Sequence, residues 1–278
     1  MRERQHFESI FCGPGGFMAD SLIFLPLAGA FVGLVVGLTG VGGGALMAPI
    51  LLFGFDYDFM TVVATDLLFA TMTKLVATGI HSRSGFVDWY AAKRLWHGSI
   101  PATLCVLVFV YLGLVSAAAW VQYVLGVLII VSGVTLILGS KVHGIQRSRR
   151  VAAPKHFKHM QYPATVISGI FLGAAVTLTS IGAGALGAVL LRALYPLRMV
   201  PKTLVATDTI HAVPISLLGG VGYLMLGEVD LILLLMLLLG SLPAVLLGCR
   251  MLHWIRSDII KFVLAVVLIL SGGKILFS

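Results

Sequence analysis

Long hydrophobic runs follow one another along the chain, separated by short polar segments. The runs at 22–38, 100–114, 121–138 and 229–247 reach or approach the roughly 20 residues that a helix needs to cross a bilayer. They do not alternate hydrophobic and polar residues with the period of two that a membrane β-strand shows. The pattern predicts transmembrane helices, because a helix satisfies its own backbone hydrogen bonds in lipid.

An internal repeat divides the chain into two halves. The sequence VATD occurs at 63–66 and again at 205–208, an offset of 142 residues. At the same offset, GFVD at 85–88 matches GEVD at 227–230, and GSIPA at 98–102 matches GSLPA at 240–244. At an offset of 140, GVGGGAL at 40–46 matches SIGAGAL at 180–186. These matches occur in the same order, which indicates two copies of one structural unit.

Each half contains five hydrophobic segments, the second of which is too short to span a membrane alone. The segments lie at about 22–38, 42–53, 60–80, 98–114 and 119–139, and at about 163–178, 182–194, 201–225, 229–249 and 257–277. We therefore predict an all-α polytopic membrane protein in which each repeat has a Gly-broken helix pair and three transmembrane helices. The predicted divisions are an N-terminal tail at 1–20, repeats at 21–140 and 162–278, and a basic cytoplasmic linker at 141–161. Met18 is an alternative to Met1 as the initiating methionine.

Loop charge predicts the orientation of the two repeats. The loop with Asp56 and Asp58 is acidic, whereas the corresponding loop of the second half carries Arg198 and is basic. Basic loops favour the cytoplasm, where we also expect the linker. The repeats are therefore predicted to be inverted, a frequent transporter design. Parallel repeats, with each broken pair counted as one kinked helix, are the alternative.

The Gly-rich segments between the first two helices of each half are candidate binding sites. Glycine disfavours a continuous helix, and the short helix that follows presents free N–H groups at a positive dipole end, which suits an anion. The candidate residues are Thr39, Gly40, Gly42, Gly43 and Gly44 in the first segment, and Thr179, Ser180, Gly182 and Gly184 in the second. Close helix packing through small residues is the alternative interpretation.

Charged residues inside hydrophobic segments are the second group of candidates. Asp66 and Asp208 occupy matching positions, and Thr65 and Thr207 precede them. Lys74 follows Asp66 by about two helical turns, and His211 follows Asp208 by three residues. Ionisable residues within a membrane usually mark a substrate or ion pathway. Lys74 is a candidate for binding an anionic substrate. The two aspartates are candidates for proton coupling, together with Thr65, Thr207 and His211. The alternative for both aspartates is that they cap helices near the interface.

Composition supports a membrane location and narrows the function. Hydrophobic residues make up 59% of the chain and charged residues only 11%, against about a quarter in soluble proteins. The net charge of +8 lies mainly in short loops, so we expect no nucleic-acid partner. The three cysteines and the His residues lack metal-ligand or disulfide spacing, and no catalytic motif is present. We expect no enzyme activity, no metal and no cofactor.

The stretch GLVVGLTGVGGGALMAPILL at 33–52, followed by Ala64 and Thr65, resembles the signature of the TauE/SafE family of sulfite and organosulfonate exporters and permeases. The second copy, SIGAGALGAVLL, lacks two glycines and the proline, and both repeats carry Thr-Asp where Thr-Ser is more usual. The resemblance implies a multi-pass protein of the bacterial inner membrane with an anionic, sulfur-containing substrate and no cofactor.

The sequence thus predicts a secondary transporter that moves a small anion across the lipid bilayer, with protons or Na⁺ as candidate coupling ions. An anion channel is the first alternative, and a membrane-embedded enzyme is the second. The substrate, the direction of transport and the oligomeric state stay open.

Overall fold

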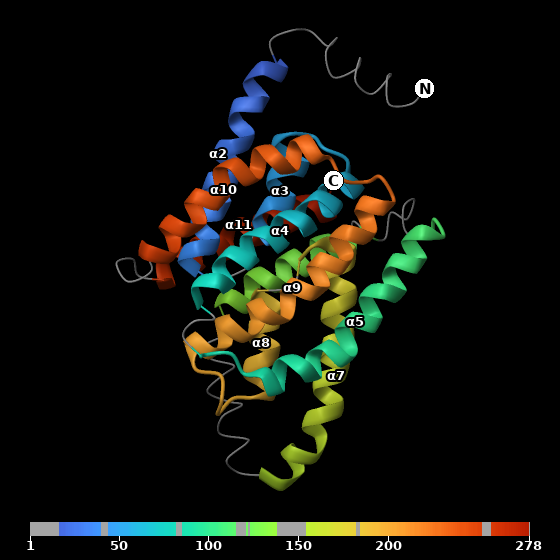
Figure 1. Cartoon of the computed structure of the whole chain (residues 1–278), viewed down its shortest axis with the longest axis vertical. Helices are drawn as coiled ribbons and strands as arrows, with labels where there is room; N and C mark the ends of the chain where they lie inside the picture. The colour runs from blue at the N-terminus through green and yellow to red at the C-terminus, as the bar shows by residue number, and fades with distance from the viewer. Residues whose placement is uncertain are drawn as a thin grey trace.

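The computed structural model describes residues 17–39, 44–81, 85–114, 121, 123–137, 154–181, 184–251 and 257–277. All regular secondary structure within these ranges is helical (Figure 1). The labelled helices are α2 (Phe17–Thr39), α3 (Gly44–Gly54), α4 (Phe59–His81), α5 (Trp89–Tyr111), α7 (Pro154–Thr179), α8 (Ala185–Leu194), α9 (Pro201–Met225), α10 (Leu231–Met251) and α11 (Ser257–Phe277).

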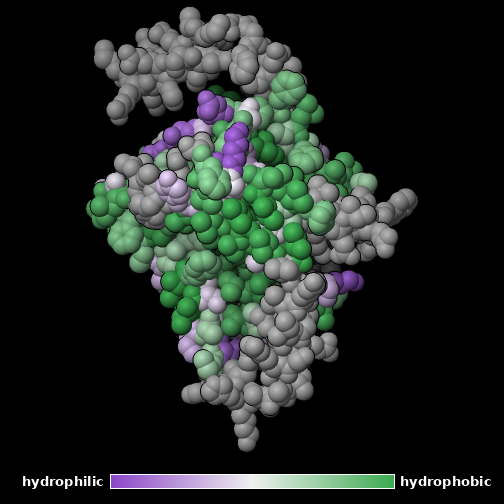
Figure 2. Space-filling model, turned by 180° about the vertical axis from the view of Figure 1, so that it is seen from behind, coloured by the Kyte–Doolittle hydropathy of each residue, from purple (hydrophilic) through white to green (hydrophobic). Residues whose placement is uncertain are grey.

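Five of the described helices contain stretches long and apolar enough to cross a membrane. These stretches are Phe59–Gly79, Trp89–Tyr111, Met160–Thr179, Pro201–Met225 and Leu231–Met251, and shorter apolar helices cover Phe24–Leu38, Tyr123–Ile137, Ala185–Leu194 and Leu264–Phe277. Many large hydrophobic side chains face outward, and Figure 2 shows them as a broad green surface across the middle of the molecule. Such a surface is suited to lipid. The expected all-helical polytopic membrane fold is confirmed.

Several helices extend beyond the hydrophobic runs that predicted them. Helix α5 begins at Trp89, nine residues before the expected segment, because Asp88 caps it: the carboxylate accepts hydrogen bonds from the N–H groups of Tyr90 and Ala91. Its added turns include Lys93 and Arg94, which interrupt the apolar pattern from which the segment was predicted. Helix α7 likewise begins at Pro154, within the stretch expected to be linker, and α2 at Phe17, within the expected tail.

Helices α4 and α9 occupy matching positions in the repeat and pack against each other at the centre of the molecule (Figure 1). Gly219 and Gly220 of α9 approach Leu67 and Leu68 of α4. On either side, α2 lies along α10 and α5 lies along α7. These two outer pairs correspond, since α2 matches α7 and α10 matches α5 in the repeat. Each outer pair therefore joins one helix from each half, and the repeat relates one pair to the other.

Glycines allow these outer pairs to approach closely. Gly33 of α2 packs against the backbone of Ser241 on α10, and Gly173 of α7 packs against Ser99 on α5. Gly33 matches Gly173 at the offset of 140, and Ser99 matches Ser241 at the offset of 142. The same contact therefore occurs twice, which gives the sequence repeat a structural counterpart.

Loops from both halves meet at each end of the bundle. At one end, which we call the acidic face (residues 55–58 and 226–230), the Asp230 N–H donates to Thr65 Oγ1 at 3.2 Å. Burial and the nearby Asp230 carboxylate raise the pKa of Tyr57 in this face. At the other end, the basic face (residues 85–88 and 195–200), the Asp88 N–H donates to Thr207 Oγ1 at 2.9 Å.

Candidate functional site

Five polar side chains are buried in the helical bundle and form what we call the polar cluster. Asp66 and Lys74 come from α4, Asp208 and His211 from α9, and Ser180 from the break between α7 and α8. None is more than 5% exposed. Lys74 lies within electrostatic range of Asp208, Asp66 and His211. Ionisable residues at such positions face a polar interior and are functional candidates.

Several atoms of the polar cluster are left without hydrogen bonds. Within the described part of the chain, both carboxylate oxygens of Asp66, Oδ1 of Asp208, Oγ of Ser180 and Nδ1 of His211 have no hydrogen-bond partner. Buried polar atoms are nearly always paired, and an unpaired one costs about 1–3 kcal/mol. The Ser180 hydroxyl lies beside Asp66, which places donor and acceptor groups together. Such an arrangement suits a polar ligand or ion.

Both aspartates lie in the interior of helices rather than at their ends. Asp66 is the eighth residue of α4 and Asp208 the eighth of α9, whose N-cap is Val200. The alternative that they cap helices near the interface is therefore wrong. Among the described residues, Lys74 is the lysine that lies near both, so the three groups in their ionised forms carry one excess negative charge.

The break before α8 has an unusual backbone. Ser180 has φ of 57° and Gly184, the N-cap of α8, has φ of 129°. The Thr179 hydroxyl stabilises this turn: it donates to the Ala175 carbonyl at 2.7 Å and accepts from the Ile181 N–H at 3.2 Å. Of the two side chains expected to serve a ligand here, Ser180 is therefore the one whose oxygen is unpaired.

The first Gly-rich segment is only partly covered by the structure. Thr39 ends α2 and Gly44 begins α3. Gly40, Gly42 and Gly43, together with Gly182 of the second segment, lie outside the described residues. That the Gly-rich segments bind a ligand stays a prediction.

Thr65 and Thr207 have a different environment from the aspartates that follow them. Their hydroxyl oxygens accept backbone N–H groups from the opposite repeat, Asp230 and Asp88 respectively. They therefore connect the helices carrying Asp66 and Asp208 to the acidic and basic faces. The repeated GFVD and GEVD sequences marked Asp88 and Asp230, but nothing in the sequence paired them with threonines 119 and 165 residues away.

Helix α5 holds His211 through two contacts that the sequence did not predict. Ser99 Oγ lies 3.1 Å from His211 Nε2, and Trp96 Nε1 donates to the His211 carbonyl at 3.1 Å. Ser99 belongs to the repeated GSxPA motif, which signalled its importance without indicating what it contacts.

Comparison with known proteins assigns this chain to a family. The family model described as sulfite exporter TauE/SafE matches residues 25–275, nearly the whole chain. The chain belongs to the TauE/SafE family. Its fold and family together make it a multi-pass membrane transporter, in agreement with the expected resemblance.

Two curated proteins resemble this chain over nearly their whole length. It is 32% identical over 259 residues to the probable membrane transporter protein YjnA of Bacillus subtilis, covering 90% of this chain and 98% of that protein. It is 24% identical over 278 residues to YunE of the same species, also a probable membrane transporter protein, covering 93% and 98% respectively. No solved structure was found to match the chain.

Proposed function

We propose that this TauE/SafE transporter moves a small, sulfur-containing anion, such as sulfite or an organosulfonate, across the bacterial inner membrane. The description of the family model as a sulfite exporter supports the substrate class. The structural observation that carries the proposal is the buried polar cluster, in which Lys74 of α4 lies near Asp66 and Asp208, and Ser180, at the break between α7 and α8, lies beside Asp66.

Lys74 is the residue that we assign to the anion. It is buried, it comes from the central helix α4, and its ammonium group has donors available for an oxyanion. Ser180 adds a hydroxyl donor from the segment that precedes α8. The free N–H groups at the start of α8 favour negative charge there as well.

We propose further that the two halves form an inverted repeat and transport by alternating access. The loop at 55–58 corresponds in the repeat to the loop at 195–200. The first contributes to the acidic face beside Asp230, and the second to the basic face beside Asp88. Corresponding loops at opposite ends of the bundle support inversion over parallel repeats.

Ion coupling follows from the charge of the polar cluster. An anion that binds at Lys74 adds negative charge to a cluster that already carries two carboxylates. A proton on Asp66 or Asp208, or a bound Na⁺, would offset that charge. A negative-inside membrane potential favours export of the anion by about 2.3 kcal/mol per charge per 100 mV. Uptake of the anion would oppose this potential and therefore needs such coupling.

Thermal-shift measurements on the purified protein test the assignment of Lys74. We expect at least one of sulfite, sulfate, thiosulfate, taurine and sulfoacetate to raise Tm, because a ligand that binds only the folded state stabilises it. The Lys74→Gln variant should lose this response, while Lys93→Gln, which changes an exposed lysine on α5, should keep it. Equal stabilisation of Lys74→Gln and wild type, or no response to any of these anions, would count against the proposal.

A further inference from the structure

The same kind of contact between the repeats occurs at both faces of the molecule. At the acidic face, Thr65 of the first repeat accepts the N–H of Asp230 from the second. At the basic face, Thr207 of the second repeat accepts the N–H of Asp88 from the first. Both aspartates also cap the helix that follows them, α10 and α5 respectively. Each face is therefore held by the same type of bond between the two halves.

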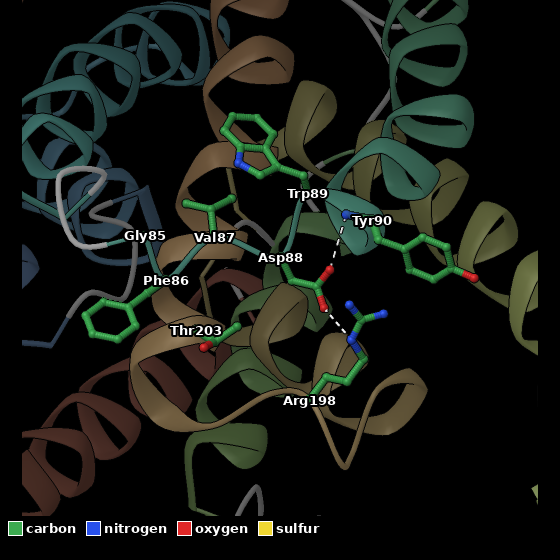
Figure 3. Close-up of a pocket in the computed structure, with 8 residues that line it drawn as sticks. All are labelled: Gly85, Phe86, Val87, Asp88, Trp89, Tyr90, Arg198 and Thr203. Carbon is green, nitrogen blue, oxygen red and sulfur yellow. Dashed lines mark hydrogen bonds and ion pairs between the residues drawn. The ribbon is translucent and has the colours of Figure 1, made fainter.

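The basic face has an additional ion pair. Arg198 Nε lies 2.9 Å from Asp88 Oδ2. A dashed line marks this ion pair in Figure 3. The Asp88 side chain is only 6% exposed, whereas that of Arg198 is 49% exposed. The Arg198 guanidinium also lies 5.1 Å from the centre of the Tyr90 ring. Asp88 thus contacts the second repeat through both its backbone and its carboxylate.

The acidic face cannot form the corresponding ion pair. At the offset of 142, the position that matches Arg198 is Asp56, and the partner there would be Asp230. Two carboxylates repel each other where an arginine and a carboxylate attract. The repeat thus gives the same backbone contact at both faces but places the charge attraction at only one of them.

A pocket of about 520 Å³ lies beside this ion pair. Phe86, Trp89, Tyr90 and Thr203 line it together with Asp88 and Arg198 (Figure 3). The pocket therefore lies between the loop before α5 and the beginning of α9. Separation of these two segments would open the basic face at this point.

We propose that the Asp88–Arg198 ion pair is a latch that holds the basic face closed, with Thr207 and Thr65 as the positioning residues of the two gates. The inference rests on the proposed alternating access, since the halves must separate at one face to admit the substrate. Without an ion pair, the acidic face opens more readily. Thr207 and Thr65 also lie next to Asp208 and Asp66, so each gate is one residue from a carboxylate of the polar cluster.

Two matched reporters measure the opening of each face. Thr61 and Thr203 occupy equivalent positions near the starts of α4 and α9, and both are partly buried. Each is replaced by Cys in a protein whose Cys12, Cys105 and Cys249 are replaced by Ala. The protein is reconstituted in nanodiscs, where both faces meet solvent, and the rate of labelling by a hydrophilic maleimide is recorded without any substrate.

Loss of the ion pair should shift labelling between the faces. We expect Arg198→Gln to raise the labelling rate of Thr203→Cys about two- to fivefold, the factor that a partly exposed ion pair supplies. The rate at Thr61→Cys should fall, because opening of one face closes the other. Arg198→Lys should restore part of the wild-type rates because it keeps the charge.

A merely structural role for Arg198 predicts a different result: unchanged rates at Thr203→Cys, or equal increases at both reporters through general loosening. Either would overturn the latch. Asp88→Asn provides an independent test should Arg198→Gln fail to fold, because asparagine still caps α5 while the charge is lost. The assay needs no substrate, so a failed anion screen would reject the substrate assignment and leave the latch to be decided by labelling alone.

Discussion

At the scale of residues, the central feature is one lysine within reach of two carboxylates in the membrane-spanning bundle. Asp66, Lys74 and Asp208 are all nearly inaccessible to solvent. Lys74 can neutralise one carboxylate fully, so the state of the other depends on a proton, a cation or the substrate. Two of the three residues are also equivalent in the repeat, which makes Lys74, matched by Ser216, the element that breaks the symmetry.

The aspartates lead to a prediction about pH. Asp66→Asn and Asp208→Asn should each flatten the pH dependence of transport in proteoliposomes, because an amide cannot exchange a proton. Asp56→Asn is the matched control: this exposed carboxylate lies in the acidic face, and asparagine tolerates its φ of 55°. Wild-type pH profiles in both cluster variants would assign coupling to another ion or another site.

At the scale of helices, hydropathy predicted the central elements well and their polar extensions poorly. The segments expected at 201–225 and 257–277 coincide with α9 and α11, because most residues of these helices are apolar. The first turns of α5 were missed because Lys93 and Arg94 interrupt the apolar pattern there. The repeat predicted that Thr65 and Thr207 would be equivalent, but their partners depend on packing between distant segments and could not be read from local sequence.

Close helix packing predicts which glycines tolerate a side chain. A Cβ at Gly240 of α10 would meet the Pro26 carbonyl of α2, whereas a Cβ at Gly273 of α11 has nothing within 4 Å. Gly240→Ala should therefore lower stability by about 1–3 kcal/mol through overpacking. Gly273→Ala should leave stability unchanged or raise it by up to about 1 kcal/mol. Thermal unfolding in detergent measures both, and equal Tm values would contradict the packing of α2 on α10.

At the scale of the whole molecule, the two faces differ in charge as well as in contacts. The acidic face carries Asp56, Asp58, Glu228 and Asp230. The basic face carries Arg198 beside Asp88, and Lys93, Arg94 and Lys202 lie near it at the starts of α5 and α9. We expect the acidic face in the periplasm and the linker at 141–158 in the cytoplasm. Single cysteines at Asp56, at Glu228 and within the linker, labelled in intact cells by an impermeant maleimide, should react at the first two sites alone. Labelling of the Asp56 and Glu228 sites from opposite sides would exclude the inverted arrangement.

Radiolabelled flux in proteoliposomes tests the central claim most directly, namely that a sulfur-containing anion crosses the membrane by way of Lys74. The wild type and Lys93→Gln should show saturable flux of the anion that gives the largest thermal shift. Lys74→Gln should reduce that flux by about tenfold or more, since removal of a buried charge partner costs at least 2 kcal/mol in binding. Wild-type flux in a well-inserted Lys74→Gln protein would contradict the account, and flux that does not saturate would indicate a channel instead.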